Sequence, residues 1–558
     1  MTHGVVSAAQ PEAAEAGALA LMQGGNAIDA AIACALVQGV IDPLMCGIGG
    51  VGSAVLHKPA NGAAENFNFL GRAPAGCRGD MWADRIISET GDGFGFVLKD
   101  RVNALGHQAV MVPGNLKGYF AMHEAHGVLP WAEVCTAAIT VAEDGWVVRP
   151  HVYAYATQDE GAQGRVRNSK ILGFTDEGAA LYLDDNGAMK RPGSIIKNAG
   201  LAESLRQIAE DGATVLYDGA LGRVLVDDMA ANGGLITLED LRAYEVNRQP
   251  MLKGSYRGYD LVTNQPGGSG VQVLETLNIL ENFDFSGMDR LGPECLRILA
   301  EAIAYAYNDI RQNVGDPDFV NVPLALLLDK DRAREMADKI KAGYKGRLDR
   351  LPSVSESKDT THVCAWDEKG NAISMTHTLG APSGVIPPGS GYILNGCMGI
   401  FDPRPNRPTS ILPGKSYTSS MSPVLMYREG ELCLAIGAPG ASYIPQAIAQ
   451  TIFNSIEFGM PLLEAIATPR VAVTKDLTID VVNRIPKFVT QELEDAGYAI
   501  NRSYLSHGFV GVHGIAIVDG TASGAADPGR DGMALVVLNC GQTVLLEHSG
   551  VKHGGVEW

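Results

Sequence analysis

The sequence predicts an α+β fold in which sheets are stacked between helices. Apolar runs with the alternation of strands gather in residues 40–70 and again in 360–558. Residues 11–36 and 115–345 instead carry alanine-rich runs and helix-capping residues. Helix-rich flanks around strand-rich segments are typical of layered α+β proteins. With 558 residues the chain is long enough for two to four domains or for one large interwoven unit.

The N-terminal part begins with two predicted helices. Pro11 stands where a first helix begins, and the alanine-rich run continues to Met22 before a Gly-Gly pair ends it. Asn26 is a good N-cap for a second helix that continues through Leu36. The alternation over 51–56 then predicts a strand.

The middle of the chain is mainly helical and the last 200 residues return to strands. Thr237 and Asp240 have the spacing of a capping box, with Asp where Glu is usual. A helix is predicted near 444–458. Strands are predicted over 361–366, 372–378, 424–427, 431–436, 512–518 and 534–547.

Composition excludes several classes of partner. The chain has 44 Lys and Arg against 63 Asp and Glu, a formal charge of −19, which opposes binding to nucleic acid or to an anionic membrane. No run of about 18 apolar residues is present, so no membrane span is expected. The first residues contain no basic leader followed by an apolar run. Nine cysteines without a CxxC pair fit a reducing compartment, and a cytoplasmic location is the expectation.

The most informative segment is the start of the strand at Thr360. A polar run ends at Asp359, and an apolar strand, a short Asp-Glu-Lys-Gly-Asn loop and a second strand ending at Thr378 follow. A threonine hydroxyl is a poor nucleophile unless a base lies beside it, and a free α-amino group on the same residue, with a pKa near 8, can be that base. Exposing this amine requires cleavage between Asp359 and Thr360, which divides the chain into 1–359 and 360–558. The alternative is that the two threonines simply favour a strand.

A series of motifs in order along the chain resembles the γ-glutamyltransferase family of N-terminal-nucleophile hydrolases. The resemblance rests on Thr360-Thr361-His362 with the loop and strand that follow, and on nine further segments: 24–31, 47–50, 112–114, 232–237, 256–259, 315–320, 419–423, 437–440 and 526–528. It implies a four-layer αββα sandwich with a helix-rich large-subunit portion and a self-processed enzyme without metal or organic cofactor. It also implies that residues 1–359 and 360–558 stay together as an interwoven heterodimer. Whether two such heterodimers associate is left open.

The resemblance also implies roles for residues around Thr360. Thr378, on the neighbouring strand, would hydrogen-bond the Thr360 hydroxyl. Gly440 and Ala441 would supply the N–H groups of an oxyanion hole, with Ala standing where the family has a second glycine. Ser419 and Ser420 match the family's pair that holds the glutamyl α-carboxylate. A structural strand threonine, a plain turn and an ordinary polar loop are the respective alternatives.

Departures from the family pattern concern the acyl group. The arginine that grips the α-carboxylate is replaced by Leu70, although Arg72 lies two positions away. The acidic pair that holds the α-amino group is replaced by Gly399 and Ile400, and a family asparagine by Gly380. Losing these anchors together disfavours a zwitterionic glutamyl head, since unpaired charges on a buried ligand are costly. Cys397 is a further candidate for the pocket wall.

The sequence therefore predicts a self-cleaving amidohydrolase or acyltransferase that acts on a small amide. The expected acyl group is oxamate-like or glutaryl-type, and the acceptor is water or an amino compound. One alternative is a γ-glutamyltransferase or glutathione hydrolase with a rearranged donor site that uses Arg72. An alternative of another class is an unprocessed, inactive scaffold protein.

Overall fold

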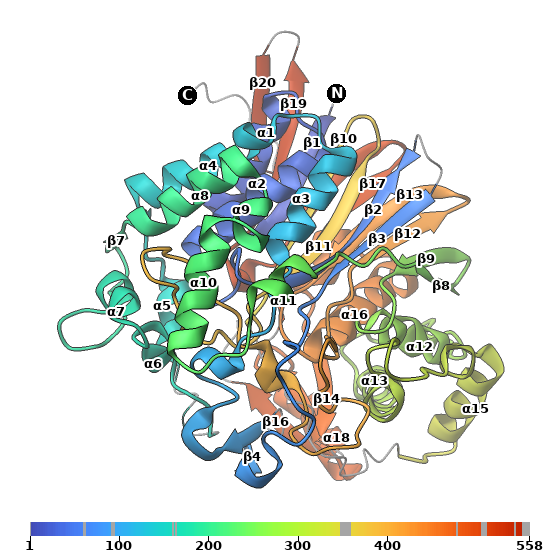
Figure 1. Ribbon diagram of the computed structural model, residues 1–558. Helices are drawn as coiled ribbons and strands as arrows, with labels where there is room; N and C mark the ends of the chain where they lie inside the picture. Colours follow the sequence, from blue (N-terminus) through green and yellow to red (C-terminus); the bar gives the residue numbers. More distant parts are fainter. Residues whose placement is uncertain are drawn as a thin grey trace.

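Two antiparallel sheets form the centre of the molecule, seen in the ribbon of Figure 1. The computed structural model describes residues 2–59, 63–90, 95–158, 161, 164–345, 359–475, 478–503, 510–540 and 543–548. The seven-stranded sheet has the order β20 (Thr543–His548), β19 (Gly532–Cys540), β1 (Thr2–Ala9), β10 (Thr361–Asp367), β11 (Ala372–Thr378), β2 (Val51–Lys58) and β3 (Ala63–Phe69). The six-stranded sheet has the order β18 (Thr521–Ala526), β17 (His513–Val518), β13 (Glu431–Gly437), β12 (Val424–Arg428), β9 (Tyr259–Thr263) and β8 (Leu252–Tyr256).

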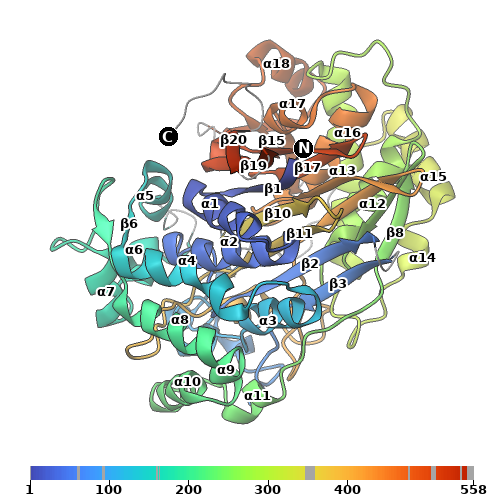
Figure 2. The ribbon, with the colours of Figure 1, turned by 90° about the horizontal axis from the view of Figure 1, so that it is seen from above.

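The inner faces of the sheets pack on each other through apolar side chains, among them Val5, Cys364, Leu425 and Ile515, all 0 % exposed. Figure 2 shows the sheets between two layers of helices. One layer covers β1, β10 and β11 and consists mainly of α1 (Pro11–Met22), α2 (Ala27–Ile41), α3 (Asn115–His126), α4 (Trp131–Asp144) and α8 (Ala199–Asp211). The other covers the six-stranded sheet with α12 (Gly270–Leu280) and α16 (Tyr443–Glu457). The helix α12 also packs on α13 (Pro293–Asn313) and α15 (Lys330–Lys341). The arrangement is the αββα sandwich that the resemblance implied.

Shorter elements surround these layers. Beyond the first helical layer lie α5 (Pro150–Ala156), α6 (Asn168–Leu172), α7 (Asp176–Tyr182), α9 (Thr214–Tyr217), α10 (Ala220–Ala231) and α11 (Leu238–Arg242). The rest are α14 (Leu324–Leu327), α17 (Leu462–Ala467), α18 (Lys487–Asp495), β4 (Ile86–Glu89), β5 (Phe96–Leu98), β6 (Trp146–Val147), β7 (Ile195–Ile196), β14 (Val471–Lys475), β15 (Thr478–Val482) and β16 (Ala499–Ser503).

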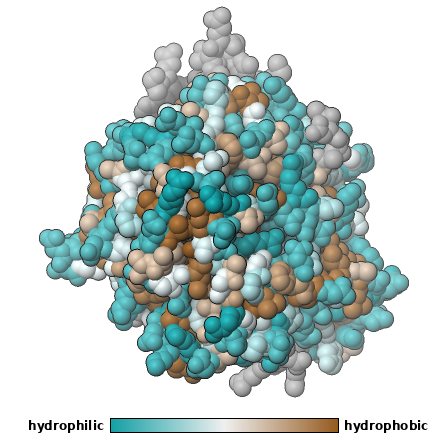
Figure 3. Space-filling model, in the orientation of Figure 1, coloured by the Kyte–Doolittle hydropathy of each residue, from teal (hydrophilic) through white to brown (hydrophobic). Residues whose placement is uncertain are grey.

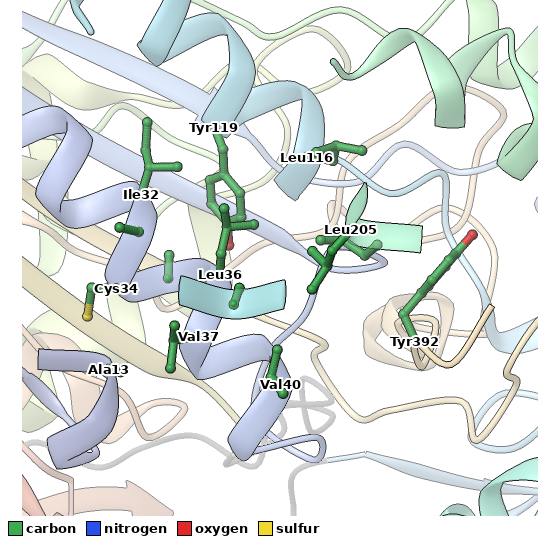
Figure 4. Packing of buried hydrophobic residues seen from close by; sticks show 14 of the residues in the cluster. Ala13, Ile32, Cys34, Leu36, Val37, Val40, Leu116, Tyr119, Leu205 and Tyr392 are labelled. Carbon is green, nitrogen blue, oxygen red and sulfur yellow. The ribbon is translucent and has the colours of Figure 1, made fainter. Parts of the chain in front are cut away.

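The helix α2 is apolar on every side because it lies between the sheet and the outer helices. Fourteen of its fifteen residues are buried. Figure 4 shows Ile32, Leu36 and Val40 of this helix near Tyr119 and Leu205 of neighbouring helices. The helix α2 packs directly on β10 and β11. Thr360 immediately precedes β10, and Thr378 is the last residue of β11.

Both predicted helix caps are confirmed. Asn26 accepts from Ile28 and Asp29 N–H, and the Asp29 carboxylate accepts from the Asn26 N–H. Thr237 and Asp240 form the same reciprocal pair at the start of α11. Aspartate thus replaces glutamate at N3 without loss of the capping box.

Some expectations were wrong in their limits. The predicted strand 534–547 is two antiparallel strands, β19 and β20. The second helix continues beyond Leu36 to Ile41. The central strand β1 was not predicted, nor were β4 to β9, β14 to β16 and β18. The polar run before Asp359 lies outside the described residues.

No helix in the part of the chain that the structure describes is long and apolar enough to cross a membrane. The face drawn in Figure 3 is mostly hydrophilic, with small, scattered hydrophobic areas.

Candidate active site

The site is built on the antiparallel pair β10 and β11. Their register pairs Thr361 with His377, so Thr360 and Thr378 face each other one step further along. Thr360 Oγ1 lies 3.1 Å from Thr378 Oγ1. Both residues are buried, with Thr360 6 % exposed and Thr378 2 %. The strand pairing alone therefore brings two hydroxyls separated by 18 residues into hydrogen-bond distance.

The hydroxyls also meet the peptide bond that precedes Thr360. Thr378 Oγ1 donates to the Asp359 carbonyl oxygen, and Thr360 Oγ1 lies 2.6 Å from the same oxygen. Gly380 N–H donates to Thr378 Oγ1 at 2.8 Å. Since a hydroxyl has one proton, Thr378 donates to the carbonyl while it accepts from Thr360 and Gly380. This arrangement places the Thr360 oxygen beside the Asp359 carbonyl and polarises that carbonyl.

A pocket opens in front of these threonines. The described residues that line it carry no charged side chain: Thr360, Thr378, Gly380, Ile400, Tyr417, Thr418, Ser419, Ser420, Met421, Ala441 and Ile444. Ser419 is held in place by its backbone, whose N–H donates to Gly267 O at 2.7 Å, and its hydroxyl accepts from Met421 N–H at 3.2 Å. Both predicted serines thus lie in the pocket with both threonines.

The loop after β13 contributes backbone N–H groups. Gly440 has φ +128° and Ala441 has φ +56°, a left-handed conformation that costs a residue with a Cβ about 1–2 kcal/mol. Within the described residues, neither N–H donates a hydrogen bond. The loop leads directly into the N-terminus of α16, whose Ile444 also lines the pocket. Free N–H groups and the positive end of a helix dipole are suited to stabilising an oxyanion.

Behind the strands lies a chain of buried hydrogen bonds that sequence reasoning missed. The His377 Nδ1 lies 2.7 Å from Tyr119 Oη, and its Nε2 lies 2.8 Å from Gln38 Oε1. Gln38 Nε2 in turn donates to Thr361 Oγ1 at 2.9 Å. Burial lowers the pKa of His377 to about 3, so its imidazole is neutral at pH 7. The one available signal was Gln38, a polar residue in the middle of the mainly apolar helix α2.

Two predicted residues lie outside this pocket. The Arg72 guanidinium donates to Asp316 Oδ2 at 3.1 Å, and the same oxygen accepts from Ser416 N–H. Cys397 is 0 % exposed and lies behind Gly380, where a Cβ would meet its sulfur at 2.5 Å. Burial raises the pKa of the Cys397 thiol. The position of Arg72, two residues after Leu70, does not reveal that its guanidinium pairs with Asp316, which lies 244 residues away in the sequence.

The replaced acidic pair has a steric explanation. A Cβ on Gly399 would meet the Asn103 carbonyl oxygen at 2.2 Å, so this position has no room for a carboxylate side chain. Ile400 lines the pocket instead. Among the described residues, no group of three or more His, Cys, Asp or Glu side chains is placed to hold a metal ion.

Comparisons with known proteins agree with this geometry. The family model described as "Gamma-glutamyltranspeptidase" matches residues 13–537. The chain is 38% identical over 544 residues to "Acylase ACY 1 proenzyme" of Pseudomonas sp. (strain SE83), covering 96% of this chain and 94% of the relative. It is 32% identical over 486 residues to "Glutathione hydrolase proenzyme" of Escherichia coli (strain K12), covering 84% of this chain and 80% of the relative. The crystal structure of cephalosporin acylase from Bacillus halodurans superposes with a TM-score of 0.83 at 26% identity, over 96% of this chain and 95% of that one.

Proposed function

Because the chain belongs to the gamma-glutamyltranspeptidase family, we propose that it cuts itself before Thr360 and then cleaves small amides through a threonyl ester. The observation that carries this proposal is the pair of hydroxyls at Thr360 and Thr378 beside the Asp359 carbonyl. Relatives named as proenzymes support the self-cleavage. The cut would leave fragments 1–359 and 360–558, each of which contributes strands to both sheets, so the fragments would stay together as a heterodimer.

The first reaction would be an acyl shift within the chain. Thr360 Oγ1 attacks the Asp359 carbonyl carbon, the C–N bond breaks, and the nitrogen takes up a proton to become the α-amine of Thr360. Water then hydrolyses the ester between Asp359 and Thr360. The products are the carboxylate of Asp359 and a Thr360 with a free hydroxyl and a free amine.

The second reaction would repeat these steps on a substrate. The α-amine of Thr360 accepts the hydroxyl proton as Oγ1 attacks the substrate carbonyl, and the N–H groups of Gly440 and Ala441 stabilise the oxyanion. The proton passes to the leaving amine as the amide bond breaks. Water, or an amino compound, then attacks the ester and releases the acyl group, which regenerates the hydroxyl. Thr378 keeps Thr360 Oγ1 in position throughout.

The acyl group is proposed to differ from γ-glutamyl. The described pocket lining carries no charged side chain, so an α-ammonium group there would lack a partner, at a cost of about 1–3 kcal/mol. The names of two relatives, Acylase ACY 1 and cephalosporin acylase, support an acyl group of another kind. Ser419 and Ser420 remain to meet a carbonyl or carboxylate. Oxamate-like and glutaryl-type amides fit this description.

A γ-glutamyl donor bound in another way is the second candidate, and the 32% identity to a glutathione hydrolase favours it. A panel of p-nitroanilides carrying γ-glutamyl, glutaryl, succinyl and oxalyl groups, with oxamate, tests both on the cleaved protein. The proposal expects kcat/KM for a donor without the α-amino group to exceed that for γ-glutamyl by roughly 10- to 100-fold. Efficient γ-glutamyl turnover with the other donors inert would establish the second candidate.

We also propose that the protein works in the cytoplasm. Eight cysteines of the described residues carry free thiols, and seven of them are buried. Cell fractionation with an antibody to the native protein tests this.

A further inference from the structure

The side chain of Asp359 lies in a second cavity, next to the pocket of Thr360. Tyr155 Oη, from α5, donates a hydrogen bond to Asp359 Oδ1. Other residues of the wall are Arg101, Asn168 and Gly399. Ile400 lines both cavities, so the peptide bond before Thr360 lies where they meet.

Apart from Asp359, the charged side chains that line the second cavity are positive. Arg101 and Arg165 both line it, and Asp359 is the one carboxylate among its described lining residues. Arg101, which lines the cavity, and Asp100, which precedes it, have φ of +56° and +59°, two consecutive left-handed residues. Such a conformation is unfavourable for residues with a Cβ and is often found where a side chain must be aimed at a ligand. Arg101 donates to Gly164 O and has no carboxylate partner among the described residues.

Self-cleavage is itself an acyl transfer, and Asp359 is its acyl group. In the uncut chain two carbon atoms, Cα and Cβ, separate the scissile carbonyl carbon from the side-chain carboxylate, as in a succinyl group. The ester that self-cleavage forms between Asp359 and Thr360 Oγ1 has the same linkage as the ester that a substrate acyl group forms with that oxygen. The part of the acyl group beyond its carbonyl is then directed into the space where the Asp359 side chain lies.

We propose that this second cavity binds the distal carboxylate of a dicarboxylic acyl group, four or five carbons long, with Tyr155 and Arg101 as its binding residues. In the uncut chain Asp359 occupies the part of this site at Tyr155, and it vacates that part after cleavage. The inference rests on the proposed threonyl-ester chemistry and selects, among the acyl groups considered there, succinyl and glutaryl over oxalyl. An oxalyl group is too short to place its carboxylate beside Tyr155.

The test compares two p-nitroanilides of equal length on the cleaved protein, glutaryl and its terminal carboxamide analogue. The ratio of their kcat/KM values reports recognition of the carboxylate alone. We expect a ratio of at least about 10 in the native protein, since charge-assisted hydrogen bonds are roughly twice as strong as neutral ones. Arg101→Gln and Tyr155→Phe should each lower the ratio about tenfold.

The chain offers two matched controls. Tyr153→Phe alters the same helix at a residue outside the cavity lining, and Arg191→Gln removes an exposed arginine. Both should keep the native ratio. A second measurement covers the case in which Tyr155→Phe fails to cut itself: free glutarate should inhibit carboxamide turnover competitively in the native protein, and at least about tenfold more weakly in Arg101→Gln.

A native ratio near 1, or native ratios in both Arg101→Gln and Tyr155→Phe, would overturn the inference while leaving the threonyl chemistry in place. Failure of the proposed function gives a different result, because the native chain would then stay uncut and turn over no donor. Preference for oxalyl over glutaryl would also overturn the inference, with the proposed function intact.

Discussion

Thr360 Oγ1 and Thr378 Oγ1 lie 3.1 Å apart at the ends of two paired strands, and Thr378 also donates to the Asp359 carbonyl. The same hydroxyl of Thr378 therefore contacts both the attacking oxygen and the carbonyl under attack. Because Gly380 N–H donates to it as well, its orientation is held by the backbone. This relationship links self-cleavage and later turnover to one side chain.

The first prediction concerns self-cleavage. The native chain should separate on a denaturing gel and in intact mass into pieces of 359 and 199 residues. Thr360→Ala removes the attacking oxygen and should leave one full-length chain, while Thr361→Ala keeps that oxygen and should still be cut. Cleavage of Thr360→Ala at the same bond would show that Thr360 is not the nucleophile.

The second prediction concerns Thr378. Thr378→Val preserves the shape of the side chain and deletes the hydrogen bonds, so kcat of the cleaved protein should fall by roughly 10- to 1000-fold, equivalent to a lost interaction of about 1.4–4 kcal/mol. Thr378→Ser restores a hydroxyl and should recover most of the activity. If the cleaved valine variant turns over at the native rate, Thr378 has a structural role only.

The third prediction concerns the strained loop after β13. Ala441 has φ +56°, whereas Ala438, in the same loop and 0 % exposed, has no positive φ. Ala441→Gly relieves the left-handed strain, which is about 1–2 kcal/mol. It also raises the conformational entropy of the unfolded chain, which costs about 0.5–1 kcal/mol of stability. The free energy of unfolding should therefore stay equal or rise by about 1 kcal/mol. Ala438→Gly has the entropic cost and also removes a buried methyl group, so it should lower the free energy of unfolding by about 1–2 kcal/mol. Urea denaturation in the uncut Thr360→Ala background measures both; a clear loss in Ala441→Gly contradicts the argument.

The fourth prediction concerns Arg72. Its ion pair with Asp316 also supports Ser416, three residues before Ser419. Arg72→Gln should lower kcat/KM for γ-glutamyl and glutaryl p-nitroanilides by the same factor, because it shifts the loop without touching either acyl group. Arg242→Gln, which breaks an exposed ion pair elsewhere, serves as control. A selective loss of γ-glutamyl turnover would instead make Arg72 a donor anchor.

The fifth prediction concerns pH. The pKa of His377 is lowered by burial to about 3, against 6.5 when exposed. Between pH 3 and 6.5 the unfolded state therefore binds the extra proton, so the stability from a neutral His377 is complete above pH 6.5 and is lost as the pH falls toward 3. His377→Gln should reduce the slope of unfolding free energy against pH in this window by about 1.4 kcal/mol per pH unit. Urea denaturation of uncut Thr360→Ala with and without His377→Gln, at pH 4.5 to 6.5, gives the difference; equal slopes would mean that His377 is protonated in the fold.

Local signals accounted for much of the fold. The Asn26 and Thr237 caps could be predicted because a capping box depends on residues only three apart. The strands around Thr360 could be predicted because a short loop joins them and alternation shows in the sequence. The strand β1 could not: it lies between β10 and β19, and its pairing partners are more than 350 residues away. Pairing between strands so far apart in the chain produces no periodic pattern in the sequence.

The sequence by itself determined the family pattern, the layered fold class and the neighbouring hydroxyls, because these follow from short-range spacing and ordered motifs. Only the tertiary structure decided which charges are free to meet a ligand. Arg72 is close to the expected anchor position in sequence, yet Asp316 neutralises it, whereas Arg101 lines the cavity of Asp359 beside Tyr155 from another part of the chain. The physical reason is that the availability of a charge depends on every group packed around it, and those groups come together only when the chain folds.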